Sequence, residues 1–590
     1  MSGWSAASRS TWLLPVLVTI VVLLVSLPTV QNGFVDLDDG PYISQKPASD
    51  GLTRQSVVFA FTSVRPMYWH PLAWLSHELD TEVYGSSPEG HHLTSALLHS
   101  FAAFVLCIIL MRMGCNVLTA ALGSLLWALH PLRVESFAWI AERKDVLCAF
   151  FFLAAVAFYL GYRNRPSHRL YAAWLTCGLL ALMSKPTAVS LPLILLLLDF
   201  WPPRRQASLV RLLVEKIPLF LGTLAVTYLA ILGQSQAMSL SRVASLPIRA
   251  ENAALSYLRY IGKTIWPVNL GCFYPFDAAR AMRWGIICFV LLCAISGFAV
   301  VQRKARPWLL IGWCWFVITL LPNSGIIQAG RQALADRFTE LPMIGIVIIV
   351  VWGASNWATD VPWRRLLLLA GTCTLLVAMG LLSIRQIGFW KDSQSLFLRS
   401  IAVEDSAYIR DNLATNLIQQ GRLSDAETQL LAAIRLSPDE YPHHNNLAYV
   451  YGKSGRAQQA LEEAKIATRL APDNYTVAET LALVDLEVKD YPGALKSFDH
   501  AVQLGSDPTT LAPLLNDSGV LLARNGETSQ AEPLFRKAVA YDPLFVDAHY
   551  NLVHDLAAMG KQFEAKEALK AAIEATGFRP EYKDFIPPAN

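Results

Sequence analysis

Three carboxylates follow the first long apolar run of the chain. The stretch "GFVDLDDGPYI" (residues 33–43) places Asp36, Asp38 and Asp39 within four residues. A carboxylate at this position can deprotonate a hydroxyl or bind a cation, and ionisable residues next to spanning helices are functional candidates by default. A solvated turn is the alternative, because adjacent aspartates are common in loops. The rest of the chain must decide between a functional carboxylate and a solvated turn.

Basic residues recur at the ends of later apolar runs. Several cations facing one carboxylate group would suit an anionic lipid phosphate held beside a general base. Structural ion pairs, such as Glu135 with Arg133 or Arg143, are the alternative. The basic candidates are Arg133, Arg143 and Lys144 in "AERKD" (which ends in Asp145), Lys185 in "SKP", Lys263, Arg331, and Arg337 in "ADR".

Histidines gather in the same segments. A divalent cation site is one interpretation, but no HxxxH or HExxH pair with a carboxylate partner supports it, and no zinc spacing occurs among the nine cysteines. Hydrogen-bonding or substrate-orienting roles are the alternative, so no cofactor is assigned. No P-loop, Rossmann glycine motif or GxSxG elbow is present, which argues against a soluble nucleotide substrate. The histidines are His70, His77, His91, His92, His99 and His130.

The composition is that of a membrane protein. Hydrophobic residues make up 54% of the 590 residues and charged residues only 16%, against about 25% charged in typical soluble chains. The net charge of +3 gives no indication of nucleic-acid binding. The first apolar run has no clear cleavage site and is interpreted as an uncleaved span. Spans of the required length are predicted at about 12–30, 93–111, 116–130, 146–162, 170–184, 187–201, 213–233, 284–302, 307–322, 340–357 and 363–384, with a re-entrant or interfacial stretch at 252–266.

Short basic loops predict the orientation of these eleven spans. The basic groups are separated by two crossings each, and the positive-inside rule places them in the cytoplasm. The N-terminus is then cytoplasmic, and the acidic loop and the C-terminal region lie outside. The groups are Arg112; Arg163, Arg165 and Arg169; Arg204, Arg205 and Arg211; Arg303, Lys304 and Arg306; and Arg364 and Arg365.

The first outer loop (31–92) has an aromatic-rich stretch. In "FAFTSVRPMYWHPLAWLSHELD" apolar residues fall at helical spacing, with Tyr68, Trp69 and Trp74 interleaved. Such a stretch suits an amphipathic helix at the membrane interface. A structured loop packed on the bundle is the alternative.

The C-terminal region is a repeat array. Small residues recur every 34 residues, with one step of 37 near Pro508, and this period is typical of tetratricopeptide repeats. Five repeats predict a solenoid with a concave groove. Amides at one position of the repeats, Asn412, Asn446 and Asn551, could bind an extended acceptor peptide, or could serve contacts between repeats. The aligned alanines are Ala426, Ala460, Ala494, Ala531 and Ala565, and Ala433, Ala467, Ala501, Ala538 and Ala572.

The motifs together resemble a known family. Besides the acidic loop, "WHPLAWLSHELD", "WALHPLRVESFAWIAERKDVL", "LMSKPTAVSLPLILLLLDFWP", "RYIGKTIWPVNLGCFYPF" and "ADRFTELPMIG", followed by the repeats, are similar to the transmembrane and tetratricopeptide repeat-containing glycosyltransferases of the GT-C superfamily. The chain looks like a bacterial relative. The resemblance implies an all-α fold with a GT-C bundle of about 11 spans followed by an α-solenoid.

The resemblance also implies the chemistry. The donor would be a polyprenyl-phosphate sugar, mannose in the eukaryotic relatives, and the acceptor a protein hydroxyl. Asp38 and Asp39 match the acidic pair, one of them the base of an inverting transfer. Arg143, Lys144, Lys185 and Arg337 are candidates for the donor phosphate, and His70, His92, Glu135 and Asp145 for orienting substrate. The related patterns "NYDD" and "ADRYTYLP" stand here as "DLDD" and "ADRFTELP", which introduces Asp36, Phe338 and Glu340.

The motifs predict the domain bounds and the cellular location of the protein. We expect a catalytic membrane domain at 1–384, a linker or first helix at 385–406, five repeats at 407–579 and a tail at 580–590, in a bacterial inner membrane with periplasmic repeats. The expected partners are the lipid-linked sugar, a protein or peptide acceptor and the bilayer, without nucleic acid. A membrane-anchored repeat scaffold without catalysis and a transporter of lipid-linked saccharide are the alternatives.

Overall fold

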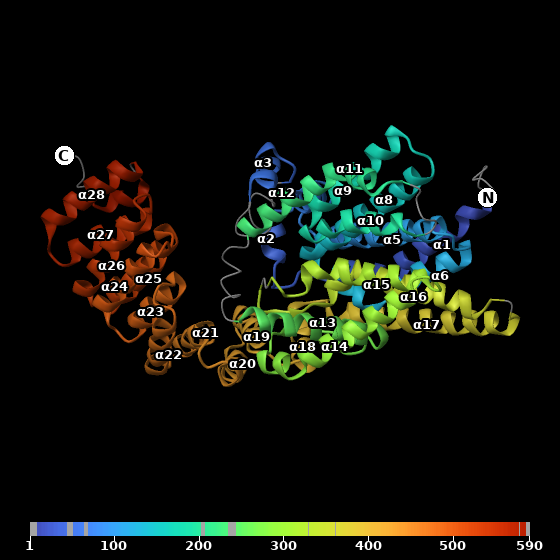
Figure 1. Ribbon diagram of the computed structural model, residues 1–590. Helices are drawn as coiled ribbons and strands as arrows, with labels where there is room; N and C mark the ends of the chain where they lie inside the picture. The colour runs from blue at the N-terminus through green and yellow to red at the C-terminus, as the bar shows by residue number, and fades with distance from the viewer. Residues whose placement is uncertain are drawn as a thin grey trace. The chain divides into compact units, whose positions relative to one another are not determined.

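The computed structural model describes residues 9–43, 51–63, 69–201, 207–233, 244–327, 330–359, 361–577 and 579–585. Tyr68, Arg204, Arg205 and residues 586–590 lie outside the described residues. The chain divides into two compact units, Met1–Ile409 and Arg410–Asn590 (Figure 1). The predicted all-α fold is confirmed. In the described part, strands are limited to β1 (Tyr274–Pro275) and β2 (Gln332–Leu334), which pair antiparallel.

The first unit contains several apolar helices. Within the described residues, five helical segments are long and apolar enough to cross a membrane, and α6 (Val117–Ala128) with the following 131–138 segment, bent by 56°, would make a sixth. Four shorter apolar helical segments accompany them. The protein is therefore multi-pass, while the count of eleven stays a prediction. The five segments are Trp12–Gln31, Pro88–Arg112, Ile140–Asn164, Ala278–Val301 and Pro362–Phe389; the shorter ones are Pro186–Asp199, Ile217–Gly233, Pro307–Asn323 and Pro342–Trp357.

These segments pack around one large apolar core. Helix α8 (Arg143–Asn164) contacts α5 (Pro88–Arg112) and α9 (His168–Ser184), and α1 (Arg9–Ser26) contacts α5 and α6. The pair α15 (Pro307–Leu320) and α16 (Pro342–Trp357) joins them through α16 and α6. Small residues permit this close approach: Gly312 and Gly345 face each other across α15 and α16, where an added Cβ would meet backbone at 2.4 Å or less. Such small-residue contacts are typical of membrane helices.

The remaining helices of this unit complete the bundle (Figure 1). Helix α13 covers the stretch for which a re-entrant or interfacial segment is predicted, and it packs along α14. Helix α18 continues the chain beyond α17, within the same unit. Their bounds are α10 (Leu191–Asp199), α11 (Leu209–Val214), α12 (Ile217–Gly233), α13 (Leu246–Ile265), α14 (Ala278–Val301), α17 (Pro362–Phe389) and α18 (Ser393–Val403), with 3₁₀ turns η1 (Leu27–Gln31), η3 (Pro131–Arg133), η4 (Ile140–Glu142), η5 (Pro186–Ser190), η7 (Leu321–Asn323) and η8 (Asp336–Thr339), and a short α7 (Val134–Ala138).

The loop 31–92 holds three short helices. They are α2 (Asp39–Ile43), α3 (Arg54–Thr62) and α4 (Pro71–Tyr84). The single amphipathic helix predicted for the aromatic stretch is wrong as a continuous element, because the stretch is divided between α3 and α4. Pro71 supplies the reason: it stands at the first position of α4, where the missing N–H costs nothing and helix cannot extend backwards. Trp74 is buried and stacks on Tyr42 at 4.5 Å, so it packs inside the protein.

The second unit consists of paired helices (Figure 1). The two helices of each repeat pack against each other, and each repeat packs against the next. The pairs are α21–α22, α23–α24, α25–α26 and α27–α28. All ten aligned alanines are buried, at 5% exposure or less, as expected where two helices cross closely. The bounds are α19 (Ala407–Gln419), α20 (Leu423–Leu436), α21 (Tyr441–Lys453), α22 (Ala457–Leu470), α23 (Tyr475–Glu487), α24 (Tyr491–Gln503), α25 (Pro508–Arg524), α26 (Thr528–Tyr541), α27 (Val546–Ala558) and α28 (Gln562–Thr576), followed by η9 (Pro580–Phe585).

The irregular repeat step has a structural counterpart in α25. This helix has 17 residues, whereas the equivalent α21, α23 and α27 each have 13. The extra residues therefore extend the first helix of the fourth repeat and leave the crossing alanines in place.

The turn inside each repeat requires a left-handed residue. Gly421, Gly455, Gly526 and Gly560 occupy this place with φ between 72° and 81°. In the third repeat the same place holds Lys489, with φ of 65°, the only non-glycine residue with positive φ in the described part of the chain. A side chain there costs roughly 1–2 kcal/mol, so the third turn is strained.

Lys489→Gly should therefore raise the stability of the repeat array by about 1 kcal/mol, since glycine removes the left-handed penalty. Thermal unfolding of the full chain in detergent measures the effect. Lys496→Gly, an exposed site inside α24, is the control and should lower stability by about 1 kcal/mol. A fall on Lys489→Gly would contradict the strain at this turn.

Candidate functional site

The acidic loop is held by Asp39. Its Oδ2 accepts the N–H of Val35 and its Oδ1 accepts the N–H of Ala141, both at 2.9 Å. Only 2% of Asp39 is exposed. Burial raises the pKa of Asp39 to about 7, against the two N–H donors, which lower it. Both oxygens are thus committed to backbone groups, and one bond ties the loop to the turn before α8.

Asp38 differs from Asp39 in its exposure and in its contacts. It is half-buried, and across the described residues it accepts no hydrogen bond and forms no ion pair. Its charge nevertheless acts on Asp39, where it contributes to the raised pKa. Of the two adjacent aspartates predicted from the sequence, Asp38 has the carboxylate that is available to another molecule.

Three cations meet at one carboxylate beside this loop. Glu142 contacts Lys144 at 3.2 Å, Lys185 at 3.0 Å and the Nε of Arg337 at 3.2 Å. Asp145 adds a 2.6 Å contact to Lys185. The cations come from the start of α8, the residue after α9 and the turn η8, so this part of the fold joins three segments.

Glu135 completes the group. It accepts the backbone N–H of Arg337 at 2.9 Å and also a guanidinium N–H of the same residue. We call Lys144, Lys185, Arg337, Glu135, Glu142 and Asp145 the charge cluster. Its three cations balance its three carboxylates, so it carries no net formal charge, and each member is at most 12% exposed by side chain.

Buried cations persist in this cluster because of the carboxylates. Burial by itself lowers the pKa of Lys185, but the charges of Asp145 and Glu142 outweigh burial and raise that pKa above its ordinary value. Lys185 therefore stays protonated at neutral pH. An incoming anion would find three permanent donors that are already partnered.

Arg143 is not part of the charge cluster, although the sequence groups it with the other three cations. Its guanidinium contacts Asp80 at 2.5 Å and donates to the carbonyls of Ser76 and His91. Arg143 is completely buried. The physical reason is helix geometry: neighbouring residues at the start of α8 face different sides, and Arg143 faces α4 and α5.

His70 lies at the start of α4 beside Tyr42. The Tyr42 hydroxyl and His70 Nε2 are 2.5 Å apart, and Lys144 lies over the Tyr42 ring at 5.3 Å. Burial, with the Lys144 charge, lowers the pKa of His70 well below its ordinary value, so the ring is neutral. His70 therefore adjoins the charge cluster through Tyr42.

His92 is separate from these groups. It is 1% exposed on α5, and within the described residues it shares no hydrogen bond or ion pair with the charge cluster. In the described part of the chain, no group of three histidine, cysteine or carboxylate side chains is placed to hold a metal ion. No ligand set for a divalent cation is therefore assigned among the described residues.

Sequence reasoning missed one member of the charge cluster. Glu142, the residue that joins the cations, is part of the "AERKD" run but is not among the predicted site residues; its place directly before Arg143 and Lys144 is the available signal. The departure at Glu340 has an explanation: it pairs with buried Arg133 at 2.8 Å. Phe338 lies under Arg337 and Lys185, at 5.0 and 5.8 Å.

In the repeats, two of the three predicted amides contact neighbouring repeats. Asn446 donates to Asp411 at 3.1 Å, and Asn551 donates to Asn516 at 2.9 Å. Asn412 has a buried Nδ2 without a hydrogen-bond partner among the described residues.

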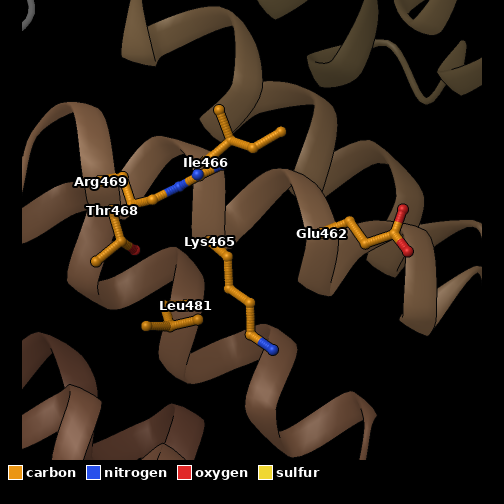
Figure 2. A pocket seen from close by; sticks show the side chains of 6 residues that line it. All are labelled: Glu462, Lys465, Ile466, Thr468, Arg469 and Leu481. Carbon is orange, nitrogen blue, oxygen red and sulfur yellow. The ribbon is translucent and has the colours of Figure 1, made fainter.

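The repeats also contain a hollow of about 580 Å³ (Figure 2). In Figure 2 the Lys465 side chain extends from α22 toward α23. The hollow is lined by Glu462, Lys465, Ile466, Thr468, Arg469 and Leu481.

Fold and site together define a multi-pass helical membrane protein that carries tetratricopeptide repeats. The tetratricopeptide repeat family model matches residues 412–475 and 516–580. A solved repeat structure, "Crystal structure of YrrB: a TPR protein with an unusual peptide-binding site", is 23% identical, covers 30% of this chain and 91% of that chain, and has a TM-score of 0.25.

The curated homologues are TMTC protein O-mannosyl-transferases, so the resemblance predicted from the motifs is confirmed. TMTC3 of Mus musculus is 21% identical over 552 residues, covering 86% of this chain and 57% of that protein. Tmtc1 of Drosophila melanogaster is 23% identical over 482 residues, covering 64% of this chain and 55% of that protein. The chain thus spans little more than half the length of these relatives.

The neutrality of the charge cluster leads to a prediction about anions. Asp145→Asn should leave the cluster with one net positive charge and bind inorganic phosphate at least several-fold more tightly than the wild type, because one competing carboxylate charge is removed. Lys185→Met should weaken phosphate binding. Calorimetric titration of the detergent-solubilised chain measures both; unchanged affinity in Asp145→Asn would contradict a competing role for this carboxylate.

Proposed function

We propose that the chain is a membrane glycosyltransferase that transfers a sugar from a polyprenyl-phosphate donor to a hydroxyl of a protein. The observation that carries the proposal is the carboxylate of Asp38, which has no hydrogen bond or ion pair among the described residues and whose charge acts on Lys144 of the charge cluster. The names of the homologues, protein O-mannosyl-transferases, support a sugar transfer to protein and suggest mannose.

The proposed reaction uses Asp38 as the general base. Asp38 takes the proton of the acceptor hydroxyl, whose oxygen attacks the anomeric carbon from the face opposite the phosphate. The bond between the anomeric carbon and the phosphate oxygen breaks, and the lipid phosphate leaves with the electron pair. The configuration at the anomeric carbon is inverted. Asp39 is not assigned this role, because both of its oxygens accept backbone N–H groups.

The leaving phosphate is assigned to Lys144, Lys185 and Arg337. Fixed cations in a water-poor site stabilise the charge that develops on the leaving group. Since the charge cluster is formally neutral before the donor binds, the phosphate must compete with Glu142 and Asp145 for these donors. Arg143 is left out of the assignment because its guanidinium is already committed to Asp80 and two carbonyls.

We assign the reaction to the periplasmic face of a bacterial inner membrane. Helix α8 begins at the charge cluster and ends at Asn164, with Arg163 in its last turn, and α5 ends at Arg112. The positive-inside rule puts these basic ends in the cytoplasm. The charge cluster, at the other end of α8, then lies outside, where lipid-linked sugars are the available donors.

Asp38→Asn should lower sugar transfer at least about 100-fold, as expected on loss of a general base, without loss of folding. The assay is transfer of radiolabelled sugar from a polyprenyl-phosphate donor to a peptide in detergent. Glu82→Gln, which changes an exposed carboxylate on α4, is the control and should transfer at the wild-type rate. Wild-type transfer by Asp38→Asn would refute the base assignment.

We also propose that the repeats bind the polypeptide acceptor. The Nδ2 groups of Asn446 and Asn551 are used between repeats, but an amide oxygen can still accept an N–H from an extended peptide. We therefore assign the amide oxygens to the acceptor peptide, while the NH₂ groups of Asn446 and Asn551 orient those two side chains.

Combined replacement of Asn412, Asn446 and Asn551 by alanine should raise KM for a protein acceptor several-fold while kcat stays near the wild-type value. Steady-state kinetics with donor in excess measure this split. Lys465→Ala, in the hollow of Figure 2, is the matched control on the repeats. An unchanged KM in the triple variant would show that the acceptor binds elsewhere.

A further inference from the structure

The acidic loop runs along the junction between α17 and α18. The N–H of Gly33 donates to the carbonyl of Lys391 at 2.9 Å, and the side chain of Asn32 donates to the carbonyl of Ile387 at 3.3 Å. These partners are about 355 residues apart in the chain. The start of the loop is therefore fixed to the segment that leads away from the last apolar span.

Ser393 adds a two-way contact to Asp36. Its hydroxyl accepts the N–H of Asp36 at 2.8 Å and donates to the Asp36 carboxylate at 2.9 Å. Ser393 is 6% exposed and is the first residue of α18. One hydroxyl thus fixes both the backbone and the side chain of Asp36, the added carboxylate of "DLDD".

Helix α18 is itself held in the first unit. Glu404, next to its end, contacts Arg259 at 2.9 Å and Arg280 at 2.5 Å. Arg399 donates to the carbonyl of Val268 at 2.8 Å. Since α18 is fixed along its length, its first residue is a rigid point of attachment.

The other end of the acidic loop is fixed by Asp39, which binds the N–H of Ala141. Asp38 lies between the two attachments, two residues after Asp36 and one before Asp39. A short segment fixed at both ends has little freedom to move its middle residue, because few backbone dihedrals remain variable.

We propose that Asp36 is a positioning residue that, through Ser393, holds Asp38 in its reactive place. The inference rests on the proposed function of Asp38 as the base. A misplacement of about 1 Å can cost 10²-fold in rate, so loss of the Ser393 contact should act on kcat. Asp36 itself does not need to touch the substrate. Ser393 lies four residues after the end of α17, at the start of the helix that precedes the first repeat helix.

The test uses Ser393→Ala, which removes both hydrogen bonds to Asp36. We expect kcat for sugar transfer to fall about 10- to 100-fold with the donor KM within twofold of wild type. Ser393→Thr keeps the hydroxyl and should restore most of the rate. Ser395→Ala, on the same helix, is the matched control and should be neutral, because its hydroxyl makes no hydrogen bond among the described residues.

Hydrogen exchange of residues 33–39 gives a readout that does not depend on activity. Faster exchange in Ser393→Ala together with a lower kcat supports the proposal. Faster exchange with unchanged kcat, or a change in donor KM alone, overturns it. If Asp38→Asn transfers normally, the proposed function fails, whereas a loss on Asp38→Asn with no effect of Ser393→Ala overturns the positioning role alone.

Discussion

The arrangement of the candidate site depends on the carboxylate of Glu142. Removing a charged group from water costs several kcal/mol, so buried charges persist only with partners. Glu142 provides that partner for Lys144, Lys185 and Arg337 together. These cations lie on three separate segments of the fold, and without a shared carboxylate their mutual repulsion would separate them. The price of this solution is a cluster with no net charge, in which a bound anion must displace an internal one.

A second constraint acts on the acidic loop. Asp36 and Asp39 both serve attachment: the first through Ser393, the second through two backbone N–H groups. The three neighbouring carboxylates therefore have different roles. The difference comes from their hydrogen-bond partners, because all three residues are aspartates. Asp38 is left as the one whose oxygens are not used by the described protein. Neutral His70, next to Tyr42 and Lys144, adds a hydrogen-bonding ring beside this region without adding charge.

Patterns in the sequence predicted the features with a strong period or composition. The apolar blocks predicted the helical membrane unit, and the alanines at a 34-residue period predicted the paired helices, because close crossings admit only small residues. The division of residues 59–80 between two helices followed from Pro71, whose effect was overlooked in an otherwise helical pattern. Lys489 in a turn that elsewhere uses glycine shows that the packing of a repeat can impose a strained conformation on an unsuitable residue.

The candidate site was predictable only as a set of residue types. Contacts between residues some 200 or 350 positions apart, such as Glu135 with Arg337 and Asp36 with Ser393, have no local signal. Neither does the direction of Arg143, which depends on the rotation of α8. Asp38 and Asp39 looked equivalent in sequence, and only the backbone donors around Asp39 separate them.

A structure of the chain with farnesyl phosphate bound would test the central claim most directly, since it locates the phosphate relative to both Asp38 and the charge cluster. We expect phosphate oxygens within about 2.7–3.2 Å of Lys144, Lys185 or Arg337, with Asp38 facing the terminal phosphate oxygen that would be bonded to the anomeric carbon of the sugar. Phosphate bound at the opposite end of α8, beside Arg163, with the charge cluster unchanged, would contradict it.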